Sequence, residues 1–396
     1  MTAATLRVDV AILGGGIAGL WLLARLRRAG YSALLLERHA LGAGQTLASQ
    51  GIIHGGLKYA LDMKLNSASD ALADMPRRWR ACLAGNGEPD LRGTAIASER
   101  HLFWSRRTLA SRVAGFFGSK LVRGRAQALE SSEWPAVLQD PAHVGAVYAL
   151  DEIVLDVPDL LRALARPHHE FIRKTEGEVR ISDAGDEVVI SVSDAGGQDR
   201  QIRAAHLVAT AGSGNEAVLA QCGLPVGAAQ RRPLQMAMIA HAPGPLWAHC
   251  FDVSDKPRVT ITTHRRKDGT LVWYVGGQIA ENGVGQNTDT FLAAVRAEMA
   301  ELLPALDFSR SQFAAFPVDR AEGATESGAK PDGPVLRQAG RVWIAWPTKL
   351  ALAPQLADLV LMRLPPPANP AFDPAALAGW PAPDIADPPW EAATWR

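Results

Sequence analysis

The stretch that decides the fold lies near the start of the chain, where residues 8–19 read VDVAILGGGIAG. Its first six residues are mostly apolar, as in a buried parallel strand, and the run stops at three consecutive glycines. Apolar residues at helical spacing follow as far as Gly30, which is typical of a helix end. Residues 32–37 form a second apolar run that ends at Glu37. The order of strand, helix and strand predicts a βαβ unit.

The glycine spacing is that of a dinucleotide-binding turn. Gly14 permits the tight turn, Gly16 lets the backbone approach a pyrophosphate, and Gly19 lets helix and strand pack closely. The helix N-terminus offers N–H groups to the phosphates. Glu37 can accept hydrogen bonds from both ribose hydroxyls, an arrangement that disfavours a 2′-phosphate. In this context the motif predicts dinucleotide binding, whereas the bare spacing would also fit a glycine-rich packing turn.

Composition excludes several classes of function. Lysine plus arginine equals aspartate plus glutamate, at 41 each, so no global field attracts nucleic acid. The three cysteines form no CxxC pair, which argues against a disulfide framework or a cysteine zinc site. No apolar run reaches the ~18–20 residues of a membrane span. We expect a cytoplasmic protein, with docking onto a membrane surface still open.

The length of 396 residues and the order of patterns predict two interleaved domains in an α/β fold. Apolar runs that end at Gly212 and Trp346 resemble further strands of the nucleotide sheet, and the pattern over 234–278 is antiparallel. We expect a nucleotide domain made of residues 1–85, 150–215 and 330–364. The inserted antiparallel-sheet substrate domain, of α+β type, takes residues 86–149 and 216–329. The proline-rich residues 365–396 are expected to lie along the surface.

Two further stretches carry a family resemblance. Residues 42–51, GAGQTLASQG, form a loop of small and hydroxyl residues directly after Glu37, and residues 53–59 read IHGGLKY. With the βαβ motif they resemble the D-amino-acid-oxidase superfamily of FAD-dependent oxidoreductases. The second stretch is particularly similar to FAD-dependent glycerol-3-phosphate dehydrogenases, and the general layout is also similar to glycine oxidases and L-2-hydroxyglutarate dehydrogenases. The resemblance implies FAD as cofactor and a Rossmann-like FAD-binding domain of the glutathione-reductase type.

The same resemblance implies a set of FAD contacts. The backbone of Val179 would meet the adenine, and the loop at Lys349 would bring donors to the N1–O2 edge of the flavin. Pro347 departs from the usual glycine-rich form of this loop and lacks an N–H. The expected cofactor residues are Gly14, Gly16, Ile17, Ala18, Gly19, Glu37, Arg38, Gln45, Thr46, Ser49, Gln50, Gly51, Val179, Ala211, Gly212, Thr348, Lys349 and Leu350.

The resemblance also implies hydride transfer from a substrate C–H, next to a hydroxyl or amine, to flavin N5. Candidate catalytic and substrate-binding residues are His54, Lys349, Arg320, Arg232 and His264. An imidazole at His54 could take the substrate proton, although a histidine among glycines also fits a structural role or a cofactor contact. Arg320 matches a position where an arginine often grips a carboxylate, unless Glu322 occupies its guanidinium. The alternative for Arg320 is a structural ion pair, for Lys349 a surface lysine in a loop, and for His264 a solvated turn. Arg232 opens the substrate-domain sheet, where the resemblance places pocket residues.

The substrate is expected to be a small anion, and a 2-hydroxy acid satisfies both the His-Gly-Gly stretch and Arg320. Oxidation of a small amino acid or of glycerol 3-phosphate, an NAD(P)H-fed monooxygenase and a non-catalytic FAD-binding protein are the alternatives. The electron acceptor, whether oxygen, a quinone or a protein, stays open. No metal site is expected, because residues 168–170, HHE, lack metal-ligand spacing. The basic apolar stretch 109–121 could touch a membrane or a partner.

Overall fold

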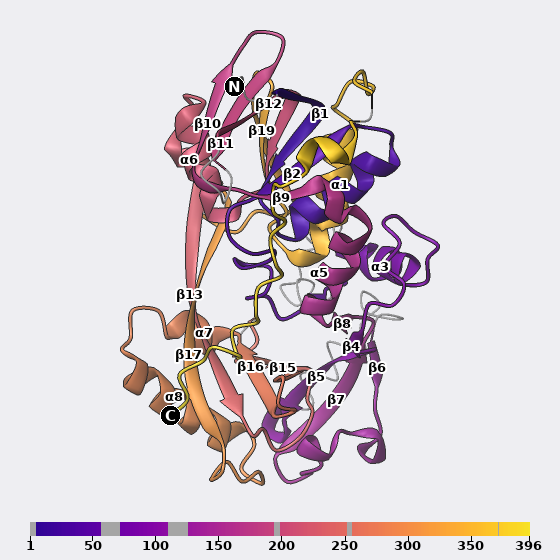
Figure 1. The fold of residues 1–396 in the computed structure, drawn as a ribbon. Coiled ribbons are helices and arrows are strands. Elements are labelled where there is room, and N and C mark those ends of the chain that lie inside the picture. Colours follow the sequence, from indigo (N-terminus) through magenta and orange to yellow (C-terminus); the bar gives the residue numbers. More distant parts are fainter. Residues whose placement is uncertain (1–4, 57–71, 110–125, 194–198, 252–255, 371) are drawn as a thin grey trace.

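The computed structural model describes residues 5–56, 72–109, 126–193, 199–251, 256–370 and 372–396. Two large β-sheets dominate this part of the chain, one at each end of the molecule, and helices cover the first of them (Figure 1). Among the described residues no helix is both long and apolar enough to cross a membrane. The basic apolar stretch 109–121 falls almost wholly outside the described residues.

The predicted βαβ unit is confirmed. Strand β1 (Thr5–Leu13) lies parallel to β2 (Ala33–Glu37), and helix α1 (Ile17–Arg28) connects them. The side chains of β1 alternate between two apolar cores, Val10 and Ile12 on one face and Ala11 and Leu13 on the other. A strand buried on both faces needs apolar residues at successive positions, which explains the nearly continuous run in the sequence.

Strands from two further parts of the chain complete the first sheet. The order β10-β11-β12-β1-β2-β9 places β12 beside β1, and β19 pairs with the other edge of β12, followed by β18. Its additional strands are β9 (Ile172–Lys174), β10 (Glu176–Asp183), β11 (Val188–Ser193), β12 (Asp199–Ala209), β18 (Val335–Ala339) and β19 (Val342–Trp346). Because β1, β2, β9, β12 and β19 run parallel, their carboxyl ends meet at one edge of the sheet.

Helices cover both faces of this sheet. Helix α1 packs with α5 (Val157–Ala165) and α9 (Ala353–Leu361) in one core, whereas α6 (Asn215–Gln221) belongs to the opposite core. Helix α5 has Pro158 in its first turn, where a proline is tolerated, and its N-cap Asp156 accepts a hydrogen bond from Asp159 N–H. Helix α3 (Met75–Leu83) joins the first core through Trp79.

The second sheet has the order β17-β13-β16-β15-β14-β5-β7-β6 and is largely antiparallel. The antiparallel pattern predicted for 234–278 is therefore confirmed, including the pairing of β15 with β16. Helix α8 (Thr288–Leu302) packs against its core. The strands are β5 (His101–Arg106), β6 (Ala126–Ala128), β7 (Val144–Leu150), β13 (Ala229–Ala240), β14 (Ala248–Phe251), β15 (Val259–Arg265), β16 (Leu271–Gly276) and β17 (Gln312–Gly323).

Two structural features connect the sheets. Strands β13 and β17 pair over twelve residues each and extend from the second sheet toward the first (Figure 1). A small sheet of β3 (Ile52–Ile53), β8 (Ile153–Leu155) and β4 (Ile96–Ser98) lies between the same regions. The space between the two large sheets is consequently walled by residues that are distant in the sequence.

The C-terminal residues 365–396 are more than a surface tail. They run along both sheets (Figure 1), and the buried carboxylate of Asp9 accepts hydrogen bonds from the N–H groups of Ala368 and Asn369. Trp380 and Trp390 are buried, the first in a core of the nucleotide sheet and the second against the substrate sheet. The segment therefore contributes apolar burial to both parts of the molecule.

Candidate active site

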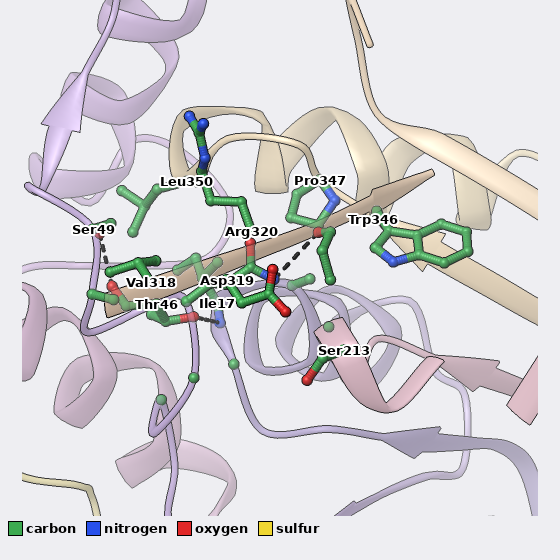
Figure 2. Close-up of a pocket in the computed structure, with 18 of the residues that line it drawn as sticks. Ile17, Thr46, Ser49, Ser213, Val318, Asp319, Arg320, Trp346, Pro347 and Leu350 are labelled. Carbon is green, nitrogen blue, oxygen red and sulfur yellow. Dashed lines mark hydrogen bonds between the residues drawn. The ribbon is translucent and has the colours of Figure 1, made fainter. Parts of the chain in front are cut away.

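One cavity of about 1370 Å³ lies where the first sheet's carboxyl edge meets the ribbon of β13 and β17. Figure 2 shows side chains from the nucleotide turn, from β17 and from the loop after β19 around it. Its volume exceeds the ~300–1,000 Å³ of ordinary small-molecule pockets. Of the sequence-predicted residues, those on its wall are Gly14, Gly16, Ile17, Ala18, Glu37, Arg38, Gln45, Thr46, Ser49, Gln50, Gly51, His54, Val179, Ala211, Gly212, Arg232, Arg320, Thr348, Lys349 and Leu350.

The turn between β1 and α1 requires glycine at two positions. Gly14 has a φ angle of +104°, and a Cβ there would lie 2.7 Å from the backbone of Ala211. A Cβ on Gly19 would lie 2.0 Å from the carbonyl oxygen of Gly14, so Gly19 packs behind the cavity wall rather than on it. Gly16 caps α1 without a side-chain hydrogen bond. The N-terminus of α1 thus faces the cavity, where its N–H groups and dipole suit a phosphate.

Glu37 holds the turn in shape from the end of β2. Its carboxylate accepts hydrogen bonds from Gly15 N–H at 2.5 Å and from His39 N–H at 2.7 Å. A carboxylate has about four lone-pair positions, so Glu37 can serve the turn and still accept from ribose hydroxyls. The carboxylate also lines the cavity beside the turn, as ribose recognition requires.

The loop at 42–51 bridges the two sides of the cavity. Thr46 Oγ1 accepts a hydrogen bond from Ile17 N–H, and Ser49 Oγ donates to the Thr46 carbonyl (Figure 2). Gln45 Nε2 donates to the carbonyl of Ala321 on β17. Gln50 Nε2 donates to carbonyls of β15 and β16. The polar side chains in this loop therefore tie the nucleotide turn to the substrate sheet.

Strand β10 is interrupted beside the cavity. Glu176 pairs with Ser193 and Arg180 with Ser191, so residues 177–179 of β10 face a single residue of β11. This irregularity releases backbone groups from the ladder at Val179, which lines the cavity. The carbonyl of Val179 accepts a hydrogen bond from Gln221 Nε2 of α6. The position is suited to backbone contact with an adenine.

The loop after β19 contains a strained residue. Thr348 has a φ angle of +65°, which is uncommon for a β-branched side chain, and Lys349 N–H donates to the carbonyl of Pro347 at 2.7 Å. Thr348 Oγ1 donates to the carbonyl of Gly333, which holds the turn. Threonine thus adopts the left-handed backbone for which glycine is the ordinary choice. Backbone strain of this kind often accompanies functional sites.

The ribbon of β13 and β17 presents one face to the cavity. Register pairs Arg232 with Arg320, Leu234 with Val318, and Met236 with Phe316, and all six residues line the cavity. Side chains two residues apart share a face of a strand, which is why the three pairs lie on the same side. This wall is apolar at one end and cationic at the other.

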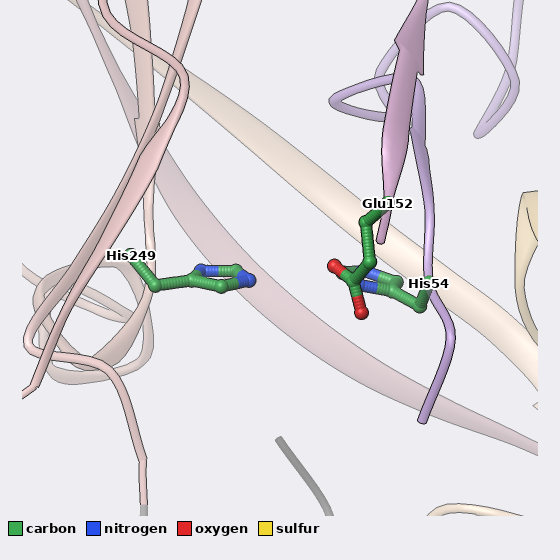
Figure 3. Close-up of side chains that lie close together, drawn as sticks. All are labelled: His54, Glu152 and His249. Atoms are coloured by element: carbon green, nitrogen blue, oxygen red, sulfur yellow. The ribbon is translucent and has the colours of Figure 1, made fainter. Parts of the chain in front are cut away.

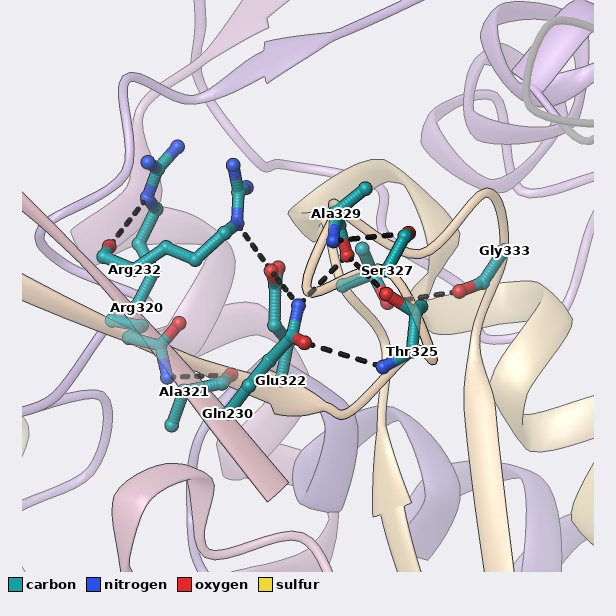
Figure 4. A network of polar contacts seen from close by, with 11 residues as sticks. Gln230, Arg232, Arg320, Ala321, Glu322, Thr325, Ser327, Ala329 and Gly333 are labelled. Carbon is teal, nitrogen blue, oxygen red and sulfur yellow. Dashed lines mark hydrogen bonds and ion pairs between the residues drawn. The ribbon is translucent and has the colours of Figure 1, made fainter. Parts of the chain in front are cut away.

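Glu322 is associated with Arg232 (Figure 4). Its carboxylate, 3% exposed, pairs with Arg232 Nε and accepts from Gln230 Nε2, whereas Arg320 Nε donates to the Arg232 carbonyl. Figure 4 shows both guanidinium groups on the same side of the ribbon. Neighbouring like charges repel, and a buried carboxylate between the strands offsets that repulsion. The rival interpretation, in which Glu322 occupies Arg320, is replaced by its pairing with Arg232.

His54 lies beside two residues that sequence reasoning missed, Glu152 and His249 (Figure 3). His54 Nδ1 is 3.2 Å from Glu152 Oε2, and Glu152 Oε1 accepts from Gly55 N–H at 2.9 Å. An ionised carboxylate can only accept, so beside ionised Glu152 a neutral imidazole carries its proton on Nδ1. An acidic residue inside the apolar run 147–155 was the available signal for Glu152.

His264 is the correction to the candidate set. It lies on β15 away from the cavity wall, and its ring stacks on Trp390 with centroids 4.1 Å apart. Its Nε2 is 3.0 Å from Thr262 Oγ1. The C-terminal segment, whose path was not anticipated in detail, covers the hairpin that the sequence suggested was open. His264 is therefore a structural residue in this fold.

A pH dependence of stability follows from the burial of His264. Desolvation lowers the pKa of His264 to about 3, below the ~6.5 of an unfolded histidine. The unfolded state therefore binds a proton at His264 more readily than the folded state does. The free energy of unfolding then decreases as pH falls from 6.5 toward 3, by up to about 1.4 kcal/mol per pH unit. Urea unfolding should show a smaller loss between pH 7 and pH 4 in His264→Gln than in the wild type. Equal losses would contradict this account; exposed His143→Gln is the control.

The cavity's donor set fits FAD. Two glycines cannot accept a Cβ, a helix N-terminus faces the cavity, and Glu37 lies at the end of the second strand. The cavity then continues beyond the nucleotide turn to the ribbon and His54, which leaves room for a second ring system and a small substrate. When FAD is bound, the first part would hold its diphosphate and ribose.

Comparison with known proteins decides the family. The family model described as DAO, FAD dependent oxidoreductase, matches residues 9–380. The chain belongs to this family of FAD-dependent oxidoreductases. Its cofactor is FAD, and the chain is an enzyme of the oxidoreductase class.

Similar proteins match this chain over nearly its whole length. The probable FAD-dependent oxidoreductase PA4991 of Pseudomonas aeruginosa is 47% identical over 390 residues, which cover 98% of both chains. Its crystal structure superposes with a TM-score of 0.83 at 43% identity, covering 98% of this chain and 99% of that one. Glycine oxidase from Geobacillus kaustophilus shares the fold, with a TM-score of 0.67, 19% identity, and coverage of 95% and 98%. L-α-glycerophosphate oxidase from Mycoplasma pneumoniae, solved with FAD bound, superposes with a TM-score of 0.65 at 13% identity. The match covers 93% of this chain and 98% of that one.

Proposed function

We propose that this flavoenzyme oxidises a C–H bond next to a hydroxyl or amine of a small anionic substrate. The observation that carries the proposal is that the FAD cavity continues to a wall bearing the cross-strand pair Arg232 and Arg320, and to the His54–Glu152 contact. FAD, when bound, supplies the hydride acceptor at flavin N5. The chain's own residues then have three tasks: to hold the anion, to limit its size and to take a proton.

The arginines are the proposed anion anchor. Arg320 lines the cavity and its Nε is fixed by the Arg232 carbonyl, which orients the guanidinium from the strand. Arg232 is oriented by buried Glu322, and its Nη2 has no hydrogen-bond partner within the described residues. A planar guanidinium with oriented N–H groups matches a carboxylate or phosphate. Leu234, Met236 and Phe316 continue this wall and favour a small substrate with an apolar part.

His54 is the proposed proton acceptor. Its Nδ1 contacts Glu152, so Nε2 is the atom that can take the proton of a substrate hydroxyl or amine. A 2-hydroxy acid satisfies both the base and the arginines. A small amino acid and glycerol 3-phosphate are the alternatives, because they also combine an oxidisable carbon with an anionic group. The loop at Lys349, on the cavity wall, would stabilise negative charge on the reduced flavin.

Anaerobic mixing tests the proposal directly. The purified yellow protein is mixed with 2-hydroxy acids, amino acids and glycerol phosphates, and absorbance in the flavin band is followed. Loss of flavin absorbance with one group of compounds identifies the substrate class. Bleaching by NADPH alone would instead indicate a monooxygenase, and no bleaching with a full complement of FAD would indicate a non-catalytic protein. Air or a quinone, added to the bleached enzyme, then identifies the electron acceptor.

Replacing Arg320 with alanine should weaken substrate binding. Loss of charge-assisted hydrogen bonds of ~1.5–3 kcal/mol raises the apparent dissociation constant by about 10–100-fold, with FAD content intact. The measurement is the substrate dependence of flavin reduction. Arg231→Ala is the matched control, since Arg231 is a neighbouring arginine of the ribbon that does not line the cavity and is engaged by Glu216 and Asp319. Equal binding by the Arg320 variant and the wild type would remove Arg320 from the substrate site.

A further inference from the structure

Three potential metal ligands converge at the end of the cavity. His54 follows β3, Glu152 lies between β7 and β8, and His249 belongs to β14 of the substrate sheet. One donor atom from each lies within 4.8 Å of the other two. The side chains of Glu152 and His54 are only 2% and 15% exposed, and His249 is buried. This is an enclosed donor set, unlike the solvated carboxylate clusters common on protein surfaces.

The three donors are oriented by neighbouring groups. His249 Nδ1 is 2.8 Å from Thr260 Oγ1, which directs the other ring nitrogen toward Glu152 and His54 (Figure 3). Gly55 N–H holds Glu152 Oε1 and thereby directs Oε2 toward the same point. Metal-binding histidines and carboxylates in proteins are oriented in this way by hydrogen bonds from the next layer. The three side chains are therefore preorganised by hydrogen bonds, as metal ligands in proteins usually are.

Distances also suit a small ion. Metal–ligand bonds of ~2.0–2.2 Å in a tetrahedral site put neighbouring ligands about 3.4 Å apart. The separation of His54 Nδ1 and Glu152 Oε2 is 3.2 Å. His249 completes the set with a ring nitrogen that lies within 4.8 Å of the other two donor atoms.

We propose that His54, Glu152 and His249 bind a divalent transition-metal ion of the Zn²⁺ type. Two imidazoles and one carboxylate suit Zn²⁺, whereas Mg²⁺ and Ca²⁺ prefer six or more oxygen ligands. The fourth position faces the cavity that His54 and His249 line, so it is open to water or to a substrate oxygen. The site would be regulatory, and this part rests on the proposed function: a metal on His54 Nδ1 leaves the ring proton on Nε2, so Nε2 has no lone pair to take the substrate proton.

The ion would also join two parts of the molecule. His54 and Glu152 are attached to the small sheet of β3 and β8, whereas His249 is attached to the large substrate sheet. A ligand that binds only the folded protein raises its melting temperature. Zn²⁺ should therefore raise the melting temperature of the FAD-loaded enzyme and inhibit flavin reduction, with both effects saturating at one ion per chain.

The test is calorimetric titration of the chelator-washed, FAD-loaded enzyme with ZnCl₂. The wild type should bind one Zn²⁺, and Glu152→Gln and His249→Gln should each weaken binding at least tenfold. Glutamine at 152 keeps the shape of the side chain and the acceptor for Gly55 N–H, so the flavin spectrum serves as a check of folding. His143→Gln is the matched control, because His143 and Asp140 form a histidine–carboxylate pair on the surface. MgCl₂ should not compete.

The outcomes separate this proposal from the proposed function. Absence of a saturable Zn²⁺ site in the wild type, or equal affinities in the wild type and both site variants, would overturn it. A loss of affinity confined to His143→Gln would overturn it too, since the ion would then lie at the surface pair. Saturable Zn²⁺ binding that depends on Glu152 and His249 would support the metal site even if no substrate in the panel bleached the flavin.

Discussion

Replacing Gly19 with alanine is expected to yield a protein without bound FAD. The new Cβ would lie 2.0 Å from the carbonyl oxygen of Gly14 and 2.8 Å from Thr210 Oγ1. The Gly14 carbonyl is backbone, and Thr210 Oγ1 is held by hydrogen bonds to the carbonyls of Leu13 and Gly14, so α1 must move away from the turn. Overpacking of this kind costs about 1–3 kcal/mol and sometimes more, and it displaces the helix N-terminus that would face the diphosphate.

Absorbance of the purified protein in the flavin band and urea unfolding measure the two parts of this prediction. Gly44→Ala is the matched control, because Gly44 belongs to the loop on the same cavity, has no positive φ, and a Cβ there would meet nothing within 4 Å. The control should stay yellow with unchanged stability. A yellow, equally stable Gly19 variant would show that close packing of α1 on the turn is dispensable for FAD binding.

The nucleotide half of the molecule was predictable because its signals are local. A glycine turn, a strand buried on both faces and an acid at the end of the next strand occur within thirty residues or so, and each has one dominant physical explanation. The antiparallel pattern over 234–278 was predictable because alternation along a strand is also a local signal. Its partner β17 was not predicted, so the sequence did not indicate that Arg232 and Arg320 are cross-strand neighbours. Helix α1 begins at Ile17 and ends at Arg28, close to Gly30, where the pattern indicated the helix end.

The substrate side of the cavity was harder to predict from the sequence, because its contacts join residues that are distant along the chain. Glu152 reaches His54 from directly before β8, the strand that pairs with β3 in the small sheet, and His249 reaches it from the substrate sheet. No spacing in the sequence encodes these contacts. Thr348 has a left-handed backbone conformation that its β-branched side chain disfavours, so residue propensity does not predict this turn. The site expected at His264 was lost because Trp390, 126 positions away, covers it. Tertiary packing decides these features, and local patterns do not report it.

Replacing His54 with glutamine is expected to slow substrate-dependent flavin reduction by about 10²–10⁴-fold, the usual contribution of a positioned general base. Glutamine has similar reach and polarity, but its amide does not take up a proton near neutral pH. The FAD content should be unchanged, because the expected diphosphate and ribose contacts come from the nucleotide turn and Glu37. Anaerobic stopped-flow reduction with the substrate named by the panel measures the rate constant.

Glu152 allows this role to be separated from simple pocket shape. Glu152→Ala should remove the acceptor for His54 Nδ1–H, so the imidazole loses its fixed tautomer and the reduction rate falls by about 10–100-fold, as for other orienting partners. Glutamine at 152 should restore part of the rate, since its carbonyl can still accept from Nδ1–H. His169→Gln, an exposed histidine outside the cavity wall, should leave the rate unchanged. If His54→Gln reduced its flavin at the wild-type rate, the substrate proton would have to leave through another group, and the cavity would act by binding and orientation alone.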